Sequence, residues 1–249
     1  MDTWDATETA QRIAAGDVSA TEVIQAAIQR LNVWNPKLNA LTHFDPDRAL
    51  QAAKSLGDQM FAGVPTVVKD LEDLKGVPTR CGTRAFDPSP AKRNADTVAQ
   101  FLDTGLIALG KTTTSEFGLT GTVEPVNGKP TNNPINLAHT AGGSSGGSAA
   151  LVAAGVVPIA HGGDGGGSIR IPAAFCGLVG LKPSRGRLAM MEKTKLMPIR
   201  IAQMGVLTHT VRDTANYYAA VEKMAPAKGL PPVGLVEGPS KGKLRIGMF

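Results

Sequence analysis

The sequence predicts an α/β fold in a single domain. Apolar, β-branched segments of strand length alternate along the chain with segments whose apolar residues recur at helical spacing, and this alternation is typical of α/β proteins. Hydrophobic side chains make up 42% of the 249 residues, which is enough for a buried core. The 29 glycines and 17 prolines supply the residues that many tight turns require.

The domain organisation follows from where the composition changes. The sequence has no internal repeat and no linker before residue 225, so we expect one domain over residues 1–249. Within it we expect N-terminal helices in 1–60 and a central core in 61–224. The Pro/Gly/Lys-rich segment 225–243 is the one candidate boundary, and it leads into a terminal strand, so 225–249 is expected to be a connection followed by that strand.

The first predicted elements are two helices. The stretch Ser19-Ala-Thr-Glu22 matches a capping box, and apolar residues follow it at helical spacing. We expect this helix to end before the Asn35-Pro36 pair, because the residue before a proline disfavours helical backbone. A second helix is expected to start at Asp45-Pro46, where an N-cap acid precedes proline in the first turn, and to reach about Leu56.

The strongest strand signal is the apolar run GVPTVVKDL (63–71), which predicts a buried strand that ends near Lys69. Further along the chain, the same two patterns predict more elements. Helices are expected at 96–104, 148–155 and 211–224, and strands at 106–109, 156–160, 176–181 and 244–249.

The charge pattern argues against a protein that binds nucleic acid. The net charge of +5 comes from 26 basic and 21 acidic residues. The basic residues are scattered in short groups, such as Lys92-Arg93 and the run from Lys241 to Arg245, and aromatic residues are not interleaved with them. Because protein surfaces that bind nucleic acid usually carry a continuous basic patch, we expect no nucleic-acid partner.

Cysteine usage and hydropathy predict a cytoplasmic protein without a metal site. Cys81 and Cys176 are too few for a disulfide framework, and neither has metal-ligand spacing. The N-terminal MDTWDATETA is acidic and polar, unlike a signal peptide. No apolar run approaches the roughly 20 residues that cross a bilayer. We therefore expect two buried thiols, no metal and no membrane contact.

Two short motifs match known patterns but lack the context that those patterns need. GLIALGKT (105–112) fits a phosphate-binding loop, yet its intervening residues are Leu, Ile, Ala and Leu, which favour a buried strand. GSSGG (143–147) fits a nucleophile elbow with Ser145 as the attacking residue, but residues 135–141 do not form a convincing strand before it. A nucleotide site and a Ser-His-Asp hydrolase are therefore disfavoured.

A third, compound pattern indicates a different active site. Lys69 closes a buried strand, GGSSGGSAA (142–150) opens a helix of small residues, and HGGDGGGSIRIPA (161–173) follows. Consecutive glycines let backbone N–H groups converge on one point, as an oxyanion hole requires, and Ser168 stands at the end of such a run. A lysine can serve as a base only when it is neutral, and burial of Lys69 would favour the neutral form.

These residues resemble the amidase signature family of serine hydrolases. The resemblance is carried by the stretch from Gly142 to Arg187 and supported by 62–71, 109–118 and 206–213. The sequence motif in 161–173 is most similar to those of general amidases and of hydrolases of the 6-aminohexanoate cyclic dimer. The resemblance implies a mixed β-sheet flanked by helices on both faces. It also implies a small-molecule amide as substrate, an acyl-enzyme intermediate and no metal or organic cofactor.

The resemblance also implies roles for individual residues. The base would be Lys69, the bridging serine Ser144 and the nucleophile Ser168, with a cis peptide bond between Gly143 and Ser144. The N–H groups of Gly165, Gly166, Gly167 and Ser168 would hold the oxyanion, while Ser145, Asp164 and Arg170 would organise the loops. Residues 116–118 are expected to border the acyl pocket.

Family enzymes usually continue into a long second half, and residues 244–249 resemble the strand that begins it. This resemblance leads us to expect a truncated amidase-signature fold that forms a homo-oligomer or associates with a complementing second half. Two alternatives stay open at this point. One is a non-catalytic half-protein that needs a partner chain, and the other is the glutamine-hydrolysing subunit of an amidotransferase.

Overall fold

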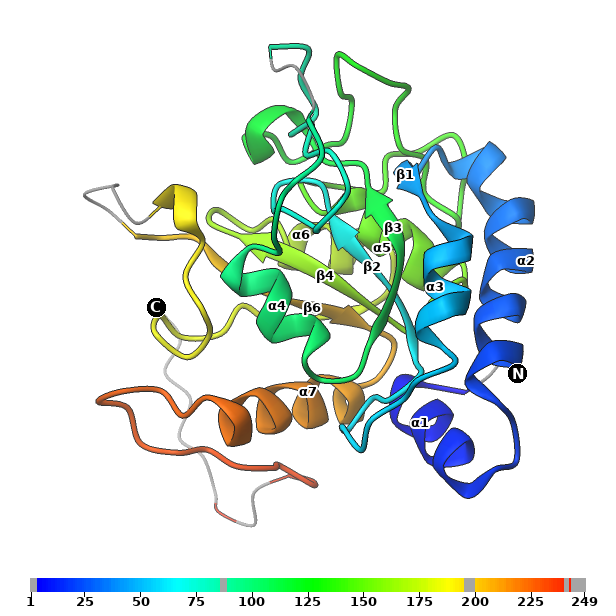
Figure 1. The fold of residues 1–249 in the computed structure, drawn as a ribbon. Helices are drawn as coiled ribbons and strands as arrows, with labels where there is room; N and C mark the ends of the chain where they lie inside the picture. The colour runs from blue at the N-terminus through cyan, green and yellow to red at the C-terminus, as the bar shows by residue number, and fades with distance from the viewer. Residues whose placement is uncertain (1–3, 86–88, 195–199, 240–241, 243–249) are drawn as a thin grey trace.

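The computed structural model describes residues 4–85, 89–194, 200–239 and 242. It is an α/β structure (Figure 1). The helices are α1 (Ala6–Ala15), α2 (Ala20–Leu38), α3 (Pro46–Ala52), α4 (Asp96–Leu102), α5 (Gly146–Ala153), α6 (Arg170–Phe175) and α7 (Val211–Met224), with short 3-10 turns at Glu116–Gly118 and Glu192–Thr194. The strands are β1 (Leu41–Phe44), β2 (Pro65–Lys69), β3 (Ile107–Thr112), β4 (Ile159–Asp164), β5 (Val179–Gly180) and β6 (Gln203–Thr208).

The strands form two three-stranded sheets that meet along β2 and β4. In the first sheet, of order β1-β3-β2, β3 runs parallel to β2 and antiparallel to β1. In the second, of order β4-β6-β5, both pairings are antiparallel. The strands β2 and β4 lie side by side in Figure 1, and the hydroxyl of Thr66 donates a hydrogen bond of 2.8 Å to the carbonyl of Ile159. The arrangement confirms the prediction of a mixed sheet.

Helices cover both faces of the sheet. Alternate residues of each strand point to opposite faces, and because both sets are apolar, each face packs against helices. Val67 of β2 and Leu207 of β6 belong to a core cluster that includes α2, α3 and α5. Their neighbours Val68 and Val206 belong to a second cluster, which includes α1, α4 and α7. The sheet therefore separates two hydrophobic cores, as the predicted architecture requires.

Several predicted elements agree with the structure. The strand ending at Lys69 is β2, the helix at 211–224 is α7, and the helix at 96–104 is α4, which ends two residues earlier. The helix at 148–155 is α5, which begins at Gly146, and the strand at 176–181 is the short β5. The strand predicted at 244–249 lies outside the described residues.

The boundaries of two predicted helices are wrong. Helix α2 continues through Pro36 to Leu38, because a proline in the last turn removes a single backbone donor and Asn39, in the left-handed region, closes the helix on the carbonyl of Asn35. Helix α3 ends at Ala52 rather than near Leu56. The residues after Ala53 are exposed, so a longer helix would have no apolar face to bury.

The strand predicted at 156–160 is also displaced. The N–H groups of Val156 and Val157 turn back to the carbonyl of Leu151 at the end of α5, and Pro158 has no N–H to offer a neighbour. Strand β4 therefore begins at Ile159 and includes the glycine pair that follows His161. Strand β3 likewise extends beyond the predicted 106–109 and includes the Gly-Lys-Thr of GLIALGKT, so this segment is a strand and not a phosphate loop.

Among the described residues, no helix is both long and apolar enough to cross a membrane.

Candidate active site

Lys69 is the last residue of β2, and its side chain is buried, with 1% of its surface exposed. Its Nζ lies 2.7 Å from the Oγ of Ser144 and 3.3 Å from the carbonyl oxygen of Gly163. Burial lowers the pKa of Lys69 to about 7, although the negative charges of Asp164 and Glu72 act in the opposite direction. Near neutral pH a large fraction of this lysine is therefore an uncharged amine.

Ser144 is held at the start of α5 by unusually close packing. A Cβ on Gly143 would lie 2.8 Å from backbone atoms of Thr122, and a Cβ on Gly147 would lie 2.4 Å from the Oγ1 of Thr113. Only glycine permits these approaches. The peptide bond between Gly143 and Ser144 is cis, as the resemblance implies.

Two further serines fasten the start of α5 to β4. The Oγ of Ser145 accepts a hydrogen bond from the N–H of Gly163 and donates one to its carbonyl, at 3.2 and 3.3 Å. The Oγ of Ser148 donates to the carbonyl of His161 at 2.7 Å. Ser145 is fully buried, so its hydroxyl has a structural position, in contrast to the exposed nucleophile that a GSSGG elbow would need.

Asp164 organises the glycine turn that carries Ser168. Its carboxylate accepts hydrogen bonds from the N–H groups of Gly167, Ile169 and Arg170, at 2.7, 3.2 and 3.3 Å. The Arg170 guanidinium adds two bonds of 2.9 Å. Burial acts to raise the pKa of Asp164, but the Arg170 side chain and these backbone donors outweigh it and lower the pKa to about 2. Asp164 is therefore a fixed anion at neutral pH.

The three side chains of the predicted triad line one cavity of about 610 Å³. Lys69, Ser144 and Ser168 share its lining with Asp164, Gly163, Gly165 and Gly166. The N–H of Gly167 is directed to Asp164, which leaves Gly165, Gly166 and Ser168 as the predicted oxyanion donors whose N–H groups are not held by that carboxylate. The structure thus brings most of the predicted site residues to the wall of a single cavity.

The remaining walls of the cavity are largely apolar. Phe117 and Gly118 line it, whereas Glu116, the third residue expected to border an acyl pocket, does not. A Cβ on Gly118 would lie 3.3 Å from the Oγ of Ser144, so a side chain there would crowd the hydroxyl. The sequence did not point to the other apolar members, which come from several distant segments: Leu71, Cys81, Leu119, Ile171, Met191, Ile201 and Ala202.

A buried ion pair supports the loop that follows Lys69. The Nζ of Lys111 lies 2.6 Å from the Oδ1 of Asp70, and both side chains are completely buried. Lys111 also donates to the Oγ1 of Thr79 at 2.7 Å, and Asp70 accepts from the N–H of Arg80. The pair thereby fixes the segment that carries Cys81 on the cavity wall. The sequence carries one signal of this contact, which is the lysine inside an apolar strand.

His161 does not supply a base to this site. Its ring is 1% exposed and lies 5.2 Å, between centroids, from the ring of Phe101. Burial lowers its pKa to about 3, and the charges of Lys69 and Lys111 act in the same direction, so the imidazole stays neutral. It lies outside the lining of the cavity that contains Ser168.

The sequence of the chain is similar to those of known amidases and amidotransferase subunits. A family model described as Amidase matches residues 22–248. The putative amidase AmiC of Mycobacterium tuberculosis is 49% identical over 244 residues, which cover 97% of this chain and 52% of that protein. A subunit of glutamyl-tRNA(Gln) amidotransferase from Acidothermus cellulolyticus is 39% identical over 224 residues, covering 87% of this chain and 44% of that protein.

The fold is also similar to that of a solved enzyme structure. A solved structure of 6-aminohexanoate cyclic dimer hydrolase superposes with a TM-score of 0.81 at 33% sequence identity, and the match covers 98% of this chain and 50% of that one. The chain therefore spans about half the length of the relatives that it matches.

Proposed function

Because the chain belongs to the amidase family, we propose that it carries the catalytic centre for hydrolysis of amide bonds, with Lys69, Ser144 and Ser168 as the reacting side chains. The position of Lys69 carries this proposal: it is buried, and its Nζ lies 2.7 Å from Ser144 Oγ on a cavity that Ser168 also lines. A desolvated lysine beside a hydroxyl is an arrangement suited to activating a nucleophile.

The first half of the reaction forms an acyl-enzyme. Neutral Lys69 takes the hydroxyl proton of Ser144, and Ser144 takes that of Ser168 as the Oγ of Ser168 attacks the amide carbonyl carbon. The carbonyl π electrons move to the oxygen, where the N–H groups of Gly165, Gly166 and Ser168 stabilise the negative charge. The proton then returns through Ser144 to the leaving nitrogen, the C–N bond breaks, and an amine or ammonia departs.

The second half releases the acid. Water attacks the acyl carbon and gives a proton through Ser144 to Lys69. The ester bond to Ser168 then breaks, and the Ser168 oxygen takes a proton back along the same path, which leaves Lys69 neutral again. Asp164 keeps the oxyanion turn in place throughout, since its carboxylate holds both the N–H of Gly167 and the guanidinium of Arg170. Ser145 anchors the start of α5 to β4, so the hydroxyl of Ser144 stays within hydrogen-bond distance of Lys69.

The walls of the cavity support a small-molecule amide with an apolar acyl group. Leu71, Phe117 and Ile171 reach the lining from three separate segments, close to the two serines. Burying an apolar group against them contributes about 25 cal/mol for each Å² removed from water. An uncharged aliphatic amide such as hexanamide is therefore the substrate that we propose as a first probe.

Labelling with a fluorophosphonate tests the proposal directly. The reagent should modify Ser168, and Lys69→Ala or Ser168→Ala should abolish the modification. Ser184→Ala, which changes an exposed serine, is the matched control and should label like the unmodified chain. Strong labelling retained in Ser168→Ala would refute the assignment of the nucleophile.

Similarity to a subunit of glutamyl-tRNA(Gln) amidotransferase supports a second candidate, which is the release of ammonia from glutamine for a partner. Ammonia release from glutamine and from hexanamide, measured side by side, separates the two functions. The apolar cavity favours hexanamide.

We also propose that full activity requires a complementing second half or a second copy of this chain, since the chain spans about half of its relatives. The rate of Ser168 labelling, measured against protein concentration, tests the second copy. A rate that rises with concentration supports it, and a constant rate contradicts it. Absence of Ser168 labelling at every concentration would favour a non-catalytic half-protein.

A further inference from the structure

The side chain of Ile171 lies between the two turns that carry Ser144 and Ser168. Its Cδ1 is 2.8 Å from the position that a Cβ on Gly167 would take, directly before Ser168. Its Cγ2 is 3.4 Å from the corresponding position on Gly142, two residues before Ser144. Because glycine leaves both positions empty, the branched side chain of Ile171 packs directly on the two turns.

The backbone directs Ile171 toward Ser168. The N–H of Ile171 donates a hydrogen bond of 2.7 Å to the carbonyl of Gly167, so one helix-like turn separates these residues. Side chains on a helix lean toward its N-terminus, which here is the turn of Ser168. Ile171 accordingly lines the cavity of about 610 Å³ that also contains Lys69, Ser144 and Ser168.

Helix α6 holds this side chain in place. The carboxylate of Asp164 binds the guanidinium of Arg170, the first residue of the helix, through two hydrogen bonds of 2.9 Å. One residue beyond Ile171, the Cα of Pro172 lies 2.9 Å from the position of a Cβ on Gly142. A β-branched side chain also has few allowed rotamers. Ile171 therefore presents a nearly fixed aliphatic surface to the cavity.

A fixed aliphatic group beside the nucleophile favours substrates that are apolar near the scissile bond. In a primary amide such as hexanamide the leaving group is ammonia, so the carbons that meet the wall belong to the acyl chain. A methyl group of that chain gains contact with Ile171, whereas a hydroxyl at the same place loses water and finds no hydrogen-bond partner on this side chain. One methylene in an apolar pocket is worth roughly 10–200-fold in kcat/KM.

We propose that Ile171 is a specificity-determining residue, which selects amides whose acyl chain is apolar at the carbons next to the carbonyl. This inference rests on the proposed function, because it concerns the substrate of the same site. It assigns to one side chain the choice between an aliphatic and a hydroxylated acyl group.

Two isosteric substrates and two isosteric side chains provide the test. 3-Methylbutanamide and 3-hydroxybutanamide have the same shape and differ by a methyl group in place of a hydroxyl. Ile171→Val and Ile171→Thr differ in the same way, and both keep the branched Cβ. The unmodified chain and Ile171→Val should prefer 3-methylbutanamide by about tenfold or more in kcat/KM, and Ile171→Thr should reduce the preference of Ile171→Val by about fivefold or more.

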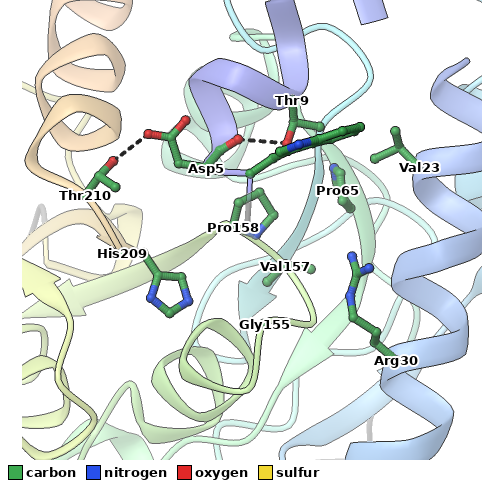
Figure 2. Close-up of a pocket in the computed structure, with 11 residues that line it drawn as sticks. Asp5, Thr9, Val23, Arg30, Pro65, Gly155, Val157, Pro158, His209 and Thr210 are labelled. Carbon is green, nitrogen blue, oxygen red and sulfur yellow. Dashed lines mark hydrogen bonds between the residues drawn. The ribbon is translucent and has the colours of Figure 1, made fainter. Parts of the chain in front are cut away.

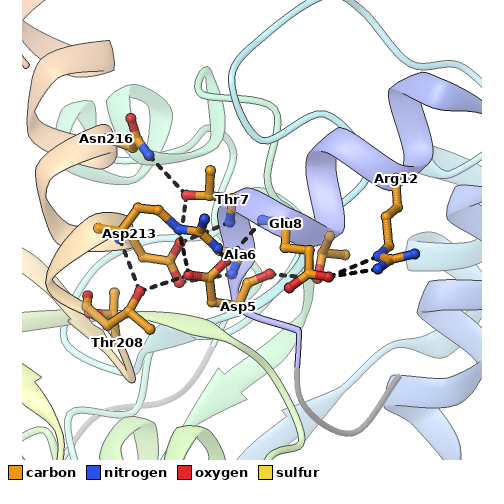
Figure 3. A network of polar contacts seen from close by, with 11 residues as sticks. Asp5, Ala6, Thr7, Glu8, Arg12, Thr208, Asp213 and Asn216 are labelled. Carbon is orange, nitrogen blue, oxygen red and sulfur yellow. Dashed lines mark hydrogen bonds and ion pairs between the residues drawn. The ribbon is translucent and has the colours of Figure 1, made fainter. Parts of the chain in front are cut away.

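Two controls separate selection from a loss of stability. Val157→Thr makes the same polar change at the wall of a second cavity (Figure 2). Asp213→Asn weakens the network that binds the N–H groups of Ala6 and Thr7 at the start of α1 (Figure 3). Neither residue lines the cavity of Ser168, so both variants should lose stability and keep the substrate preference of the unmodified chain.

Turnover of the two amides distinguishes failure of this inference from failure of the proposed function. If both amides are hydrolysed and Ile171→Thr keeps the preference of Ile171→Val, the inference is overturned and the proposed function stands. If neither amide is hydrolysed, the inference also falls, and fluorophosphonate labelling of Ser168 shows whether the assigned nucleophile is present.

A second variant covers the case in which Ile171→Thr does not fold, which circular dichroism would show. Ile171→Ala removes the aliphatic group without adding a hydroxyl, so it should lower the preference for 3-methylbutanamide by about threefold or more. An unchanged preference in Ile171→Ala would overturn the inference.

Discussion

At the scale of single residues, the nearest partner decides which of two buried lysines can act as a base. Lys69 and Lys111 are both inside the protein, but Lys111 lies 2.6 Å from the carboxylate of Asp70, and Lys69 has a serine hydroxyl as its near neighbour. A carboxylate partner stabilises the charged ammonium, whereas a hydroxyl does so far less. Lys69 is therefore the lysine from which a proton is easily removed.

The first prediction concerns the pH dependence of Ser168 labelling. The pKa of Lys69 is about 7, and the neutral amine is the active form, so the labelling rate should rise as pH increases through about 7 and then level off. Glu72→Gln removes a negative charge that stabilises the ammonium, so its midpoint should move to lower pH. Rates measured from acid to mildly alkaline pH decide the matter, and a rate that falls with pH would contradict the role of Lys69.

The second prediction separates two adjacent serines. Ser144→Ala should reduce labelling and amide turnover by about 10²–10⁴-fold with little loss of stability, because its hydroxyl contacts Lys69 and relays a proton. Ser145→Ala should instead destabilise the fold by about 1–3 kcal/mol, since it removes the buried hydroxyl that accepts from the N–H of Gly163. Kinetics and urea unfolding of both variants are the measurements. Equal losses of stability would contradict the division.

At the scale of the elements, the contact of α5 with the sheet depends on the absence of side chains. The third prediction is that Gly147→Ala lowers the free energy of unfolding by about 1–3 kcal/mol through overpacking, despite the better helix propensity of alanine. Its Cβ would lie 2.4 Å from Thr113 Oγ1 and 2.7 Å from the backbone oxygen of Ala40. Gly238→Ala, with nothing within 4 Å, is the control. A neutral Gly147→Ala would show that the contact can relax.

Sequence patterns predict elements whose signal is local, and they miss those that depend on distant partners. Strand β2 was predictable because it lies in a continuous apolar, β-branched run, and helix α7 because its apolar residues recur at helical spacing. Helix α1 escaped because its buried apolar residues are the alanines Ala6 and Ala10 and its N-terminus is bound by Asp213, about 200 residues away. Strand β6 escaped as well, because its segment QMGVLT mixes polar residues and a glycine with the apolar ones and gives no continuous apolar run.

The candidate site divides in the same way. Lys69, Ser144 and Ser168 could be named because each lies in a recognisable segment. The apolar wall and the Asp70–Lys111 pair could not, because residues such as Leu71 and Met191 meet only after the chain has folded. The direction of the Gly167 N–H toward Asp164 likewise depends on turn geometry that a glycine run leaves open.

At the scale of the whole molecule, one sheet serves two cores. Val67 belongs to the cluster with α2, α3 and α5, and Val68 belongs to the cluster with α1, α4 and α7. Because the same strand connects them, neither cluster can lose its packing without disturbing the other.

The fourth prediction follows from this shared sheet. Val67→Ala and Val68→Ala should each lower the free energy of unfolding by about 1.5–3 kcal/mol, and both should shift the same single transition. Thermal unfolding followed by far-ultraviolet circular dichroism and by tryptophan fluorescence tests this, with Val33→Ala, an exposed valine, as the control. Two separate transitions would show that the clusters unfold independently.

The close packing around the start of α5 also has a practical consequence for protein engineering. Gly143, Gly146 and Gly147 each face a neighbour within 2.8 Å of where a Cβ would lie, so most variants randomised there would be lost before their chemistry could be assayed. Leu119 and Ile201 reach the same cavity with more than half of their surface exposed. A mutant library for new amides should therefore vary these two positions and leave the glycines untouched.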